Sequence, residues 1–85
     1  VAHTVGQLLR QLGKDRQVLA VTHLPQVAAC ADHHLLVSKL ATGKQTQSTV
    51  TPIATEARVR ALARMLGGGE QSEISLAHAR EMLAA

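Results

Sequence analysis

The fold depends on one stretch of the sequence, Gln17-Val18-Leu19-Ala20-Val21-Thr22-His23-Leu24-Pro25-Gln26-Val27-Ala28. Its first part, Gln17 to Val21, is apolar and predicts a buried strand in a sheet that helices cover on both faces. Thr22-His23 follows directly, and Leu24 to Ala31 predicts a short helix with Pro25 in its first turn. A buried strand that ends on a polar pair, just before a helix, is where α/β proteins place ligand-contacting groups.

The composition of the chain restricts its class. Its 85 residues correspond to one small domain or to part of a larger one. It lacks Phe, Tyr and Trp, so its core must be built from Leu, Val, Ile, Ala and Met. Cys30 is the single cysteine, which excludes an internal disulfide and a cysteine-based metal cluster. No apolar run approaches the roughly 20 residues of a membrane span, so we expect no membrane partner.

The net charge of +3 indicates a mildly basic surface, with a nucleic-acid-binding face as the alternative. The second interpretation is weakened by two features of the sequence. The chain has no run of Lys or Arg, and it has no aromatic side chain that could stack on bases.

Apolar spacing predicts a helix before this stretch and a β-hairpin after it. Residues 1–12 are expected to form an amphipathic helix that Gly13 ends. Leu35 to Leu40 and Gln45 to Thr51 predict two strands of a hairpin. Its turn lies at Gly43, where a positive φ is possible, and Pro52 closes it.

Two further helices are expected after the hairpin. Thr55 is the predicted N-cap of the first, and Gly67-Gly68-Gly69 is its predicted end. Ser72 to Ala84 predicts the last helix, with Leu76, Ala79 and Leu83 on one face and Glu73 near its positive end. In the first of these helices, the apolar stripe is Val59, Leu62, Ala63 and Leu66, and the cations expected to face outward are Arg58, Arg60 and Arg64.

The sequence contains no complete nucleotide-binding motif. A phosphate loop needs Gly-x4-Gly-Lys-Ser/Thr, but Gly13-Lys14 is followed by Asp15 and Gly43-Lys44 by Gln45. No predicted strand ends in an Asp-Glu pair that could hold Mg²⁺ and a water molecule. Leu66 to Glu70 is similar to the signature of ABC-type ATPases, but glycine stands where the phosphate-contacting serine belongs, and we interpret it as a helix end. The chain by itself is therefore predicted to be inactive in ATP hydrolysis.

The five histidines differ in what they indicate. None form the i, i+4 pair of a helical metal site, and His33-His34 reads as a surface pair near a turn. His23 stands at the predicted strand end, where an imidazole can donate a hydrogen bond to a phosphate or a polarised water. The alternative is a histidine that is satisfied in the core or a loop. Cys30, among alanines, reads as a small packing residue.

Residues 22–28 resemble the segment that carries the switch histidine in the RecN family of bacterial DNA repair proteins, relatives of SMC and ABC-type ATPases. The likeness extends along the chain. Residues 5–13 resemble the preceding helix, residues 37–39 the following strand, residues 61–68 a further family marker, and residues 77–85 the C-terminal helix. Residues 41–51 fit no fixed pattern of the family.

The resemblance implies that residues 1–85 are the C-terminal portion of an ATPase head with the P-loop NTPase fold. That fold would be α/β, with part of a mostly parallel sheet, flanking helices and a β-hairpin. The phosphate loop, coiled coil, signature and Asp-Glu strand would lie before Val1. The complete protein would bind ATP and Mg²⁺, whereas this chain alone would bind neither.

The resemblance also implies a function and its partners. His23 matches the position that senses the γ-phosphate, and it is the catalytic residue that we expect in this chain. The partners would be the rest of the head, a second head in a homodimer, and DNA. The family acts in recombinational repair of double-strand breaks, so we expect a cytoplasmic, nucleoid-associated protein.

Two alternatives stay open at this point. The first is a part of another ABC-type or SMC-type ATPase, against which the residues around Leu24-Pro25-Gln26 argue. The second is a small, basic, non-catalytic module that binds nucleic acid, for which Arg58, Arg60 and Arg64 are the best support.

Overall fold

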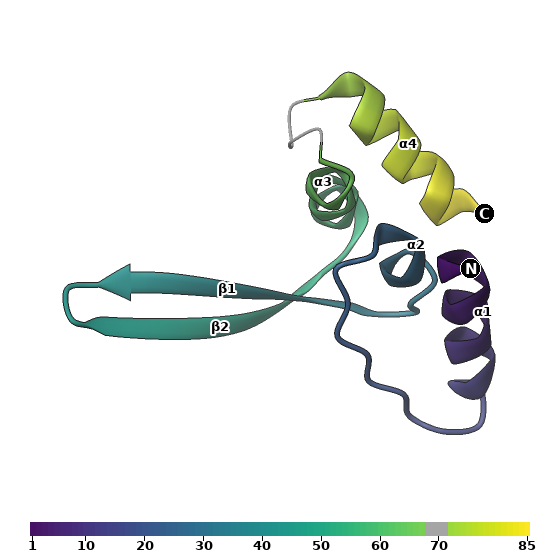
Figure 1. Cartoon of the computed structure of the whole chain (residues 1–85), viewed down its shortest axis with the longest axis horizontal. Coiled ribbons are helices and arrows are strands. Elements are labelled where there is room, and N and C mark those ends of the chain that lie inside the picture. The colour runs from purple at the N-terminus through teal and green to yellow at the C-terminus, as the bar shows by residue number, and fades with distance from the viewer. Residues whose placement is uncertain (68–71) are drawn as a thin grey trace.

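Helices surround one end of a long β-hairpin in this chain (Figure 1). The structure is a computed structural model, and it describes residues 1–67 and 72–85. The elements agree with a small α/β architecture. In chain order they are α1 (Ala2–Leu12), α2 (Pro25–Ala28), β1 (His34–Thr42), β2 (Gln45–Ile53), α3 (Thr55–Met65) and α4 (Glu73–Ala84).

Helix α1 confirms the predicted first helix, and Gly13 follows it as the C-cap. It packs beside α2 through its one buried residue, Gly6. A Cβ atom at this position would lie 2.8 Å from Sγ of Cys30 and 3.1 Å from the carbonyl oxygen of Gln26. Glycine therefore allows the two helices to approach closely, and Cys30 is the buried packing residue that the sequence predicts.

The strand predicted over Gln17 to Val21 is wrong for this structure. These residues have no regular structure, and Leu19 and Val21 are 82% and 99% exposed. A strand of this kind needs neighbouring strands for its backbone N–H and C=O groups and helices over its faces. Within residues 1–67 and 72–85 the only sheet is the β1–β2 hairpin, and this segment pairs with neither of its strands.

The hairpin is confirmed, with strands two to three residues longer than predicted. The two strands pair antiparallel from His34 opposite Ile53 to Thr42 opposite Gln45. Gly43 has a φ of +60°, as the sequence predicts for the turn. Pro52 lies within β2 and does not close it. The expected part of a mostly parallel sheet is not seen among the described residues, because their one sheet is antiparallel.

The core lies between α3 and α4, with a contribution from α2. Leu62 and Ala63 of α3 and Ala79 of α4 have no exposed surface. This confirms the apolar faces that spacing predicts in both helices. The cluster consists of Ala28, Val59, Leu62, Ala63 and Ala79, with Ala29, Met65, Leu66, Leu76 and Leu83 packed against it.

The ends of α3 and α4 show which local signals the structure uses. Ser72 caps α4, because its Oγ accepts a hydrogen bond from the Ser75 N–H at 3.3 Å. Thr55 is not the N-cap of α3. Ala54 occupies that position, and Thr55 is the first helical residue, with a φ of +50°. Its hydroxyl instead donates to the carbonyl oxygen of Ala54 at 2.8 Å.

The predicted glycine stop after α3 falls partly on residues that the structure describes. Gly67 directly follows the C-cap Leu66 and has a φ of +88°, a conformation that favours glycine and commonly ends a helix. Gly68, Gly69 and Glu70, which complete the signature-like stretch, lie outside the described residues.

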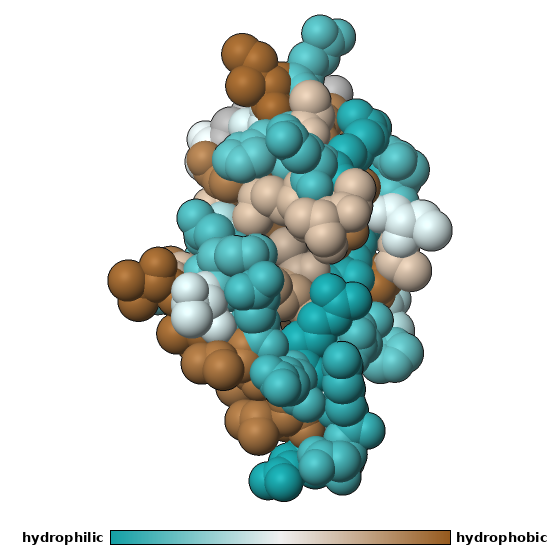
Figure 2. Space-filling view, turned by 90° about the vertical axis from the view of Figure 1, so that its right-hand side faces the viewer, coloured by the Kyte–Doolittle hydropathy of each residue, from teal (hydrophilic) through white to brown (hydrophobic). Residues whose placement is uncertain are grey.

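Hydrophobic side chains gather on the lower part of one face of the molecule, at the height of α1 and the segment after it (Figure 2). Two leucines of α1, Leu8 and Leu12, are 56% and 46% exposed.

No helix among the described residues has the length and apolar character needed to cross a bilayer.

Candidate functional site: the His23 turn and its support

The predicted site residue His23 lies in a bend between α1 and α2, and its side chain is exposed. It does not stand at the end of a strand, which corrects the expected setting. We call residues 22–24 the His23 turn. The backbone N–H of Leu24 donates to Oγ1 of Thr22 at 3.0 Å across this turn. Such a hydroxyl contact two residues along the chain stabilises a tight local bend.

Helix α2 begins immediately after the His23 turn. Pro25 is its first residue and is buried, as are Val27 and Ala28. The helix is a single turn, closed by hydrogen bonds such as that from the Ala29 N–H to the Pro25 carbonyl oxygen at 2.9 Å. One turn of helix is unstable by itself, since nucleation costs more than one hydrogen bond returns. Tertiary contacts must therefore hold α2 in place.

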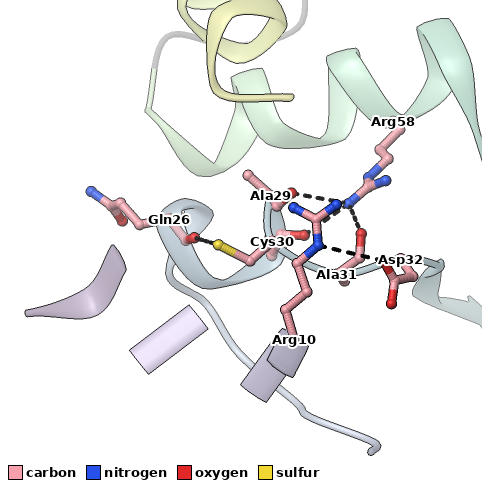
Figure 3. Close-up of polar contacts among 8 residues, drawn as sticks. Arg10, Gln26, Ala29, Cys30, Ala31, Asp32 and Arg58 are labelled. Carbon is pink, nitrogen blue, oxygen red and sulfur yellow. Dashed lines mark hydrogen bonds and ion pairs between the residues drawn. The ribbon is translucent and has the colours of Figure 1, made fainter. Parts of the chain in front are cut away.

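Arg58 of α3 supplies such contacts at the C-terminal end of α2 (Figure 3). Its Nη2 donates to the carbonyl oxygens of Ala28 at 3.1 Å, Ala29 at 3.4 Å and Ala31 at 2.6 Å. These contacts join parts of the chain 27 to 30 residues apart. The prediction that Arg58 faces outward is therefore wrong, whereas Arg60 and Arg64 are exposed as expected.

The physical reason for this arrangement is the chemistry of a helix end. The last carbonyl groups of a helix lack partners within the helix and carry partial negative charge. The Arg58 guanidinium meets them with its Nη2 group and its positive charge. Beside this contact, Nε of Arg10 lies 3.6 Å from a carboxylate oxygen of Asp32, which links α1 to the loop after α2 (Figure 3).

His34 lies at the base of the hairpin, next to Arg58. Partial burial lowers its pKa below the ordinary 6.5, and the positive charge of Arg58 lowers this pKa further. Burial also lowers the pKa of Arg58, as does Arg10, whereas Asp32 raises it. Within the described residues, His34 Nδ1 and Arg58 Nε are both buried without a hydrogen-bond partner. His34 is therefore a half-buried, neutral group, unlike the surface pair that we predicted, while His33 is exposed.

Two open hollows accompany these residues. One of about 290 Å³ lies at the base of the hairpin, where the start of β1 and the end of β2 line it together with Asp32 and Arg58. Another of about 470 Å³ is lined by residues of α1, α2 and α4, including His3 and His78, and by Cys30 after α2. Among residues 1–67 and 72–85, no group of three or more His, Cys, Asp or Glu side chains could hold a metal ion.

The structure thus offers one exposed imidazole on a short bend, followed by a helix that is fixed at its far end. Such an imidazole can donate a hydrogen bond to an anionic group that approaches from solvent. Sequence reasoning identified His23 but missed Arg58. One signal could have found it: Arg58 precedes the fully buried Leu62 by four residues, so both lie on the same face of α3.

Comparison with known proteins gives a consistent result. No family model matches the chain. It is 48% identical over 84 residues to the DNA repair protein RecN of Vibrio cholerae, 50% over 82 residues to that of Haemophilus influenzae, and 52% over 79 residues to that of Streptomyces coelicolor. These matches cover 99%, 96% and 93% of the chain.

The same matches cover a small share of each relative. The chain spans 15%, 15% and 14% of the lengths of these three proteins. Identity of about one residue in two, sustained over nearly every residue of the chain, is found in relatives from several bacterial genera. The chain therefore belongs to the RecN family of DNA repair proteins and corresponds to the C-terminal part of its members.

Proposed function

We propose that this chain is the C-terminal part of the ATPase head of a RecN-like DNA repair protein, and that His23 contacts the γ-phosphate of ATP there. The observation that carries the proposal is the identity of 48–52% to RecN proteins over 93–99% of the chain. The exposure of His23 supports it, since a buried imidazole could not meet a phosphate supplied by other parts of the protein.

The chemistry of His23 in this role is electrostatic. Phosphoryl transfer spreads charge over the equatorial oxygens of the γ-phosphate, and positioned donors stabilise that charge. The imidazole of His23 would donate one such hydrogen bond. In this proposal Mg²⁺ and the other phosphates would be held by other parts of the complete protein, and we derive no step through the metal.

Hydrolysis would therefore need the complete protein. The rest of the head and a second head would complete the ATP site, and the 85 residues by themselves would be inactive. Recombinational repair of double-strand breaks, contact with DNA, and a cytoplasmic, nucleoid-associated location belong to the same proposal.

The test is steady-state ATP hydrolysis by the complete protein, with ATP binding measured in parallel. We expect His23→Ala to lower turnover by about 100-fold, the loss seen when one donor to a transition-state oxyanion is removed, while binding is retained. His33→Ala is the matched control, because His33 is also an exposed loop histidine. Unchanged turnover in His23→Ala would reject the role of His23 and leave the family relationship intact.

The alternative of a basic nucleic-acid module has less support. It relied on Arg58, Arg60 and Arg64, and the guanidinium of Arg58 is engaged by backbone carbonyl groups of its own chain. Tight binding of duplex DNA by the 85-residue chain at physiological salt, lost in Arg60→Ala, would favour it.

A further inference from the structure

We infer that Arg58 is a positioning residue for His23, which it orients by holding helix α2 at its C-terminal end. The inference rests on the proposed function of His23 and adds to it a residue on a distant element. Arg58 and His23 are 35 positions apart in the sequence, and α2 is the connection between them.

The first step of the argument concerns what holds α2. The helix has four residues and no side-chain cap at its N-terminal end. It packs against α1 and α3, and the Cys30 thiol donates locally to the Gln26 carbonyl oxygen at 3.3 Å. The polar contacts from a distant element come from Arg58, which donates to Ala28, the last residue of α2, and to Ala29 and Ala31 directly after it. The shortest of them, to the Ala31 carbonyl oxygen at 2.6 Å, lies beyond the helix end. Arg58 therefore holds both the last turn of α2 and the chain that leaves it.

The second step concerns the rigidity between α2 and His23. One residue, Leu24, separates His23 from Pro25, and the ring of Pro25 fixes its own φ. A residue before proline is also restricted to extended conformations, and Leu24 has a φ of −96° and a ψ of 116°. The Leu24 N–H is further tied to Thr22 Oγ1. A rotation of α2 would therefore be transmitted to His23 rather than absorbed by the turn.

The third step concerns why Arg58 is suited to this task. None of the ion pairs found among residues 1–67 and 72–85 includes Arg58, so no carboxylate competes directly for its guanidinium group. Arg60, two residues later on the same helix, is exposed and makes none of these contacts. The two arginines thus differ in their contact with α2 and provide a matched comparison.

The test is a double-mutant cycle of Arg58 and His23 in the complete protein. The quantity measured is the single-turnover rate of ATP hydrolysis at saturating ATP. We expect Arg58→Met to lower the rate by about tenfold or more, because small misplacements of a catalytic group are costly. Arg60→Met should leave it within about twofold. In the His23→Ala background, Arg58→Met should lower the rate by less than about twofold, since residues that act through one another are not additive.

Arg58→Lys is the control for a loss of activity that is caused by a folding defect. Lysine keeps the positive charge but not the planar fork, so we expect an intermediate loss in the same cycle. Equal losses from Arg58 substitution with and without His23 would overturn the inference and leave the role of His23 standing. Full activity of His23→Ala would instead reject the role of His23, and this inference with it.

Discussion

At the scale of single residues, Arg58 and His34 are the side chains whose surroundings differ most from their sequence context. Both were expected at the surface, and both have a buried nitrogen without a hydrogen-bond partner in the part of the chain that the structure describes. Partial burial lowers the pKa of His34, and the positive charge of Arg58 lowers it further, because burial and like charge act in the same direction on an imidazole. Neutral His34 thus accommodates the cation that holds α2.

The lowered pKa of His34 predicts a pH dependence of stability. The unfolded chain takes up a proton near pH 6.5, whereas the folded chain does so at lower pH. The free energy of unfolding should therefore fall as the pH drops below about 6.5, until the folded pKa is passed. Urea unfolding of the 85-residue chain between pH 8 and pH 5 measures this loss.

His34→Gln should remove that part of the pH dependence, whereas His33→Gln should retain it, because His33 is exposed. If His34→Gln keeps the pH profile of the unsubstituted chain, His34 is not the group responsible.

At the scale of the elements, local signals explain some helix ends and not others. Ser72 caps α4 as its position in the sequence suggests, since a serine precedes the first turn and Glu73 follows. Thr55 carries the same signal for α3, but the chain leaving β2 brings Ala54 into the cap position. The connection to a neighbouring element thus overrides a preference worth about 1 kcal/mol.

Two substitutions separate these caps. Ser72→Ala should lower the free energy of unfolding by about 1 kcal/mol, because the Ser75 N–H loses its acceptor. Thr55→Ala should change it by less than about 0.5 kcal/mol, since the Thr55 hydroxyl caps no helix. Urea unfolding of both variants under one set of conditions gives the comparison, and equal losses would contradict the assignment of the caps.

At the scale of the whole molecule, burial is concentrated in a small part of the chain. The α3–α4 contact and α2 contain the core cluster, while the hairpin projects from it with most of its residues exposed (Figure 1). Residues 17–21 are as apolar as a core strand, yet they contribute nothing to this core. Stability of the chain should therefore depend on α3 and not on the stretch that looks most buried in the sequence.

Leu62→Ala and Val21→Ala test this distribution. The first should cost about 2–5 kcal/mol, because it leaves a cavity at a fully buried site. The second should cost less than about 0.5 kcal/mol, because Val21 is 99% exposed. Unfolding of the 85-residue chain followed by circular dichroism measures both. A cost for Val21→Ala near that of Leu62→Ala would mean that residues 17–21 are buried in solution.

The sequence by itself determined the elements whose signals are local. Helical spacing identified α1, α3 and α4, and Gly43 between two strand-like runs identified the hairpin. It also singled out His23, through a resemblance that identity to RecN proteins supports. The helix and hairpin signals depend on residues a few positions apart, so they can be recognised without knowledge of the fold.

Tertiary structure alone decided the rest. An apolar run such as Gln17 to Val21 becomes a strand only when other strands satisfy its backbone, and among the described residues it pairs with neither strand of the hairpin. Arg58 turned inward because the carbonyl groups at the end of α2 need donors, and these groups lie 27 to 30 residues away in the sequence. The position of Arg58 four residues before Leu62 indicates which face of α3 it shares, but the carbonyl groups that it meets are fixed only when distant segments come together in the fold.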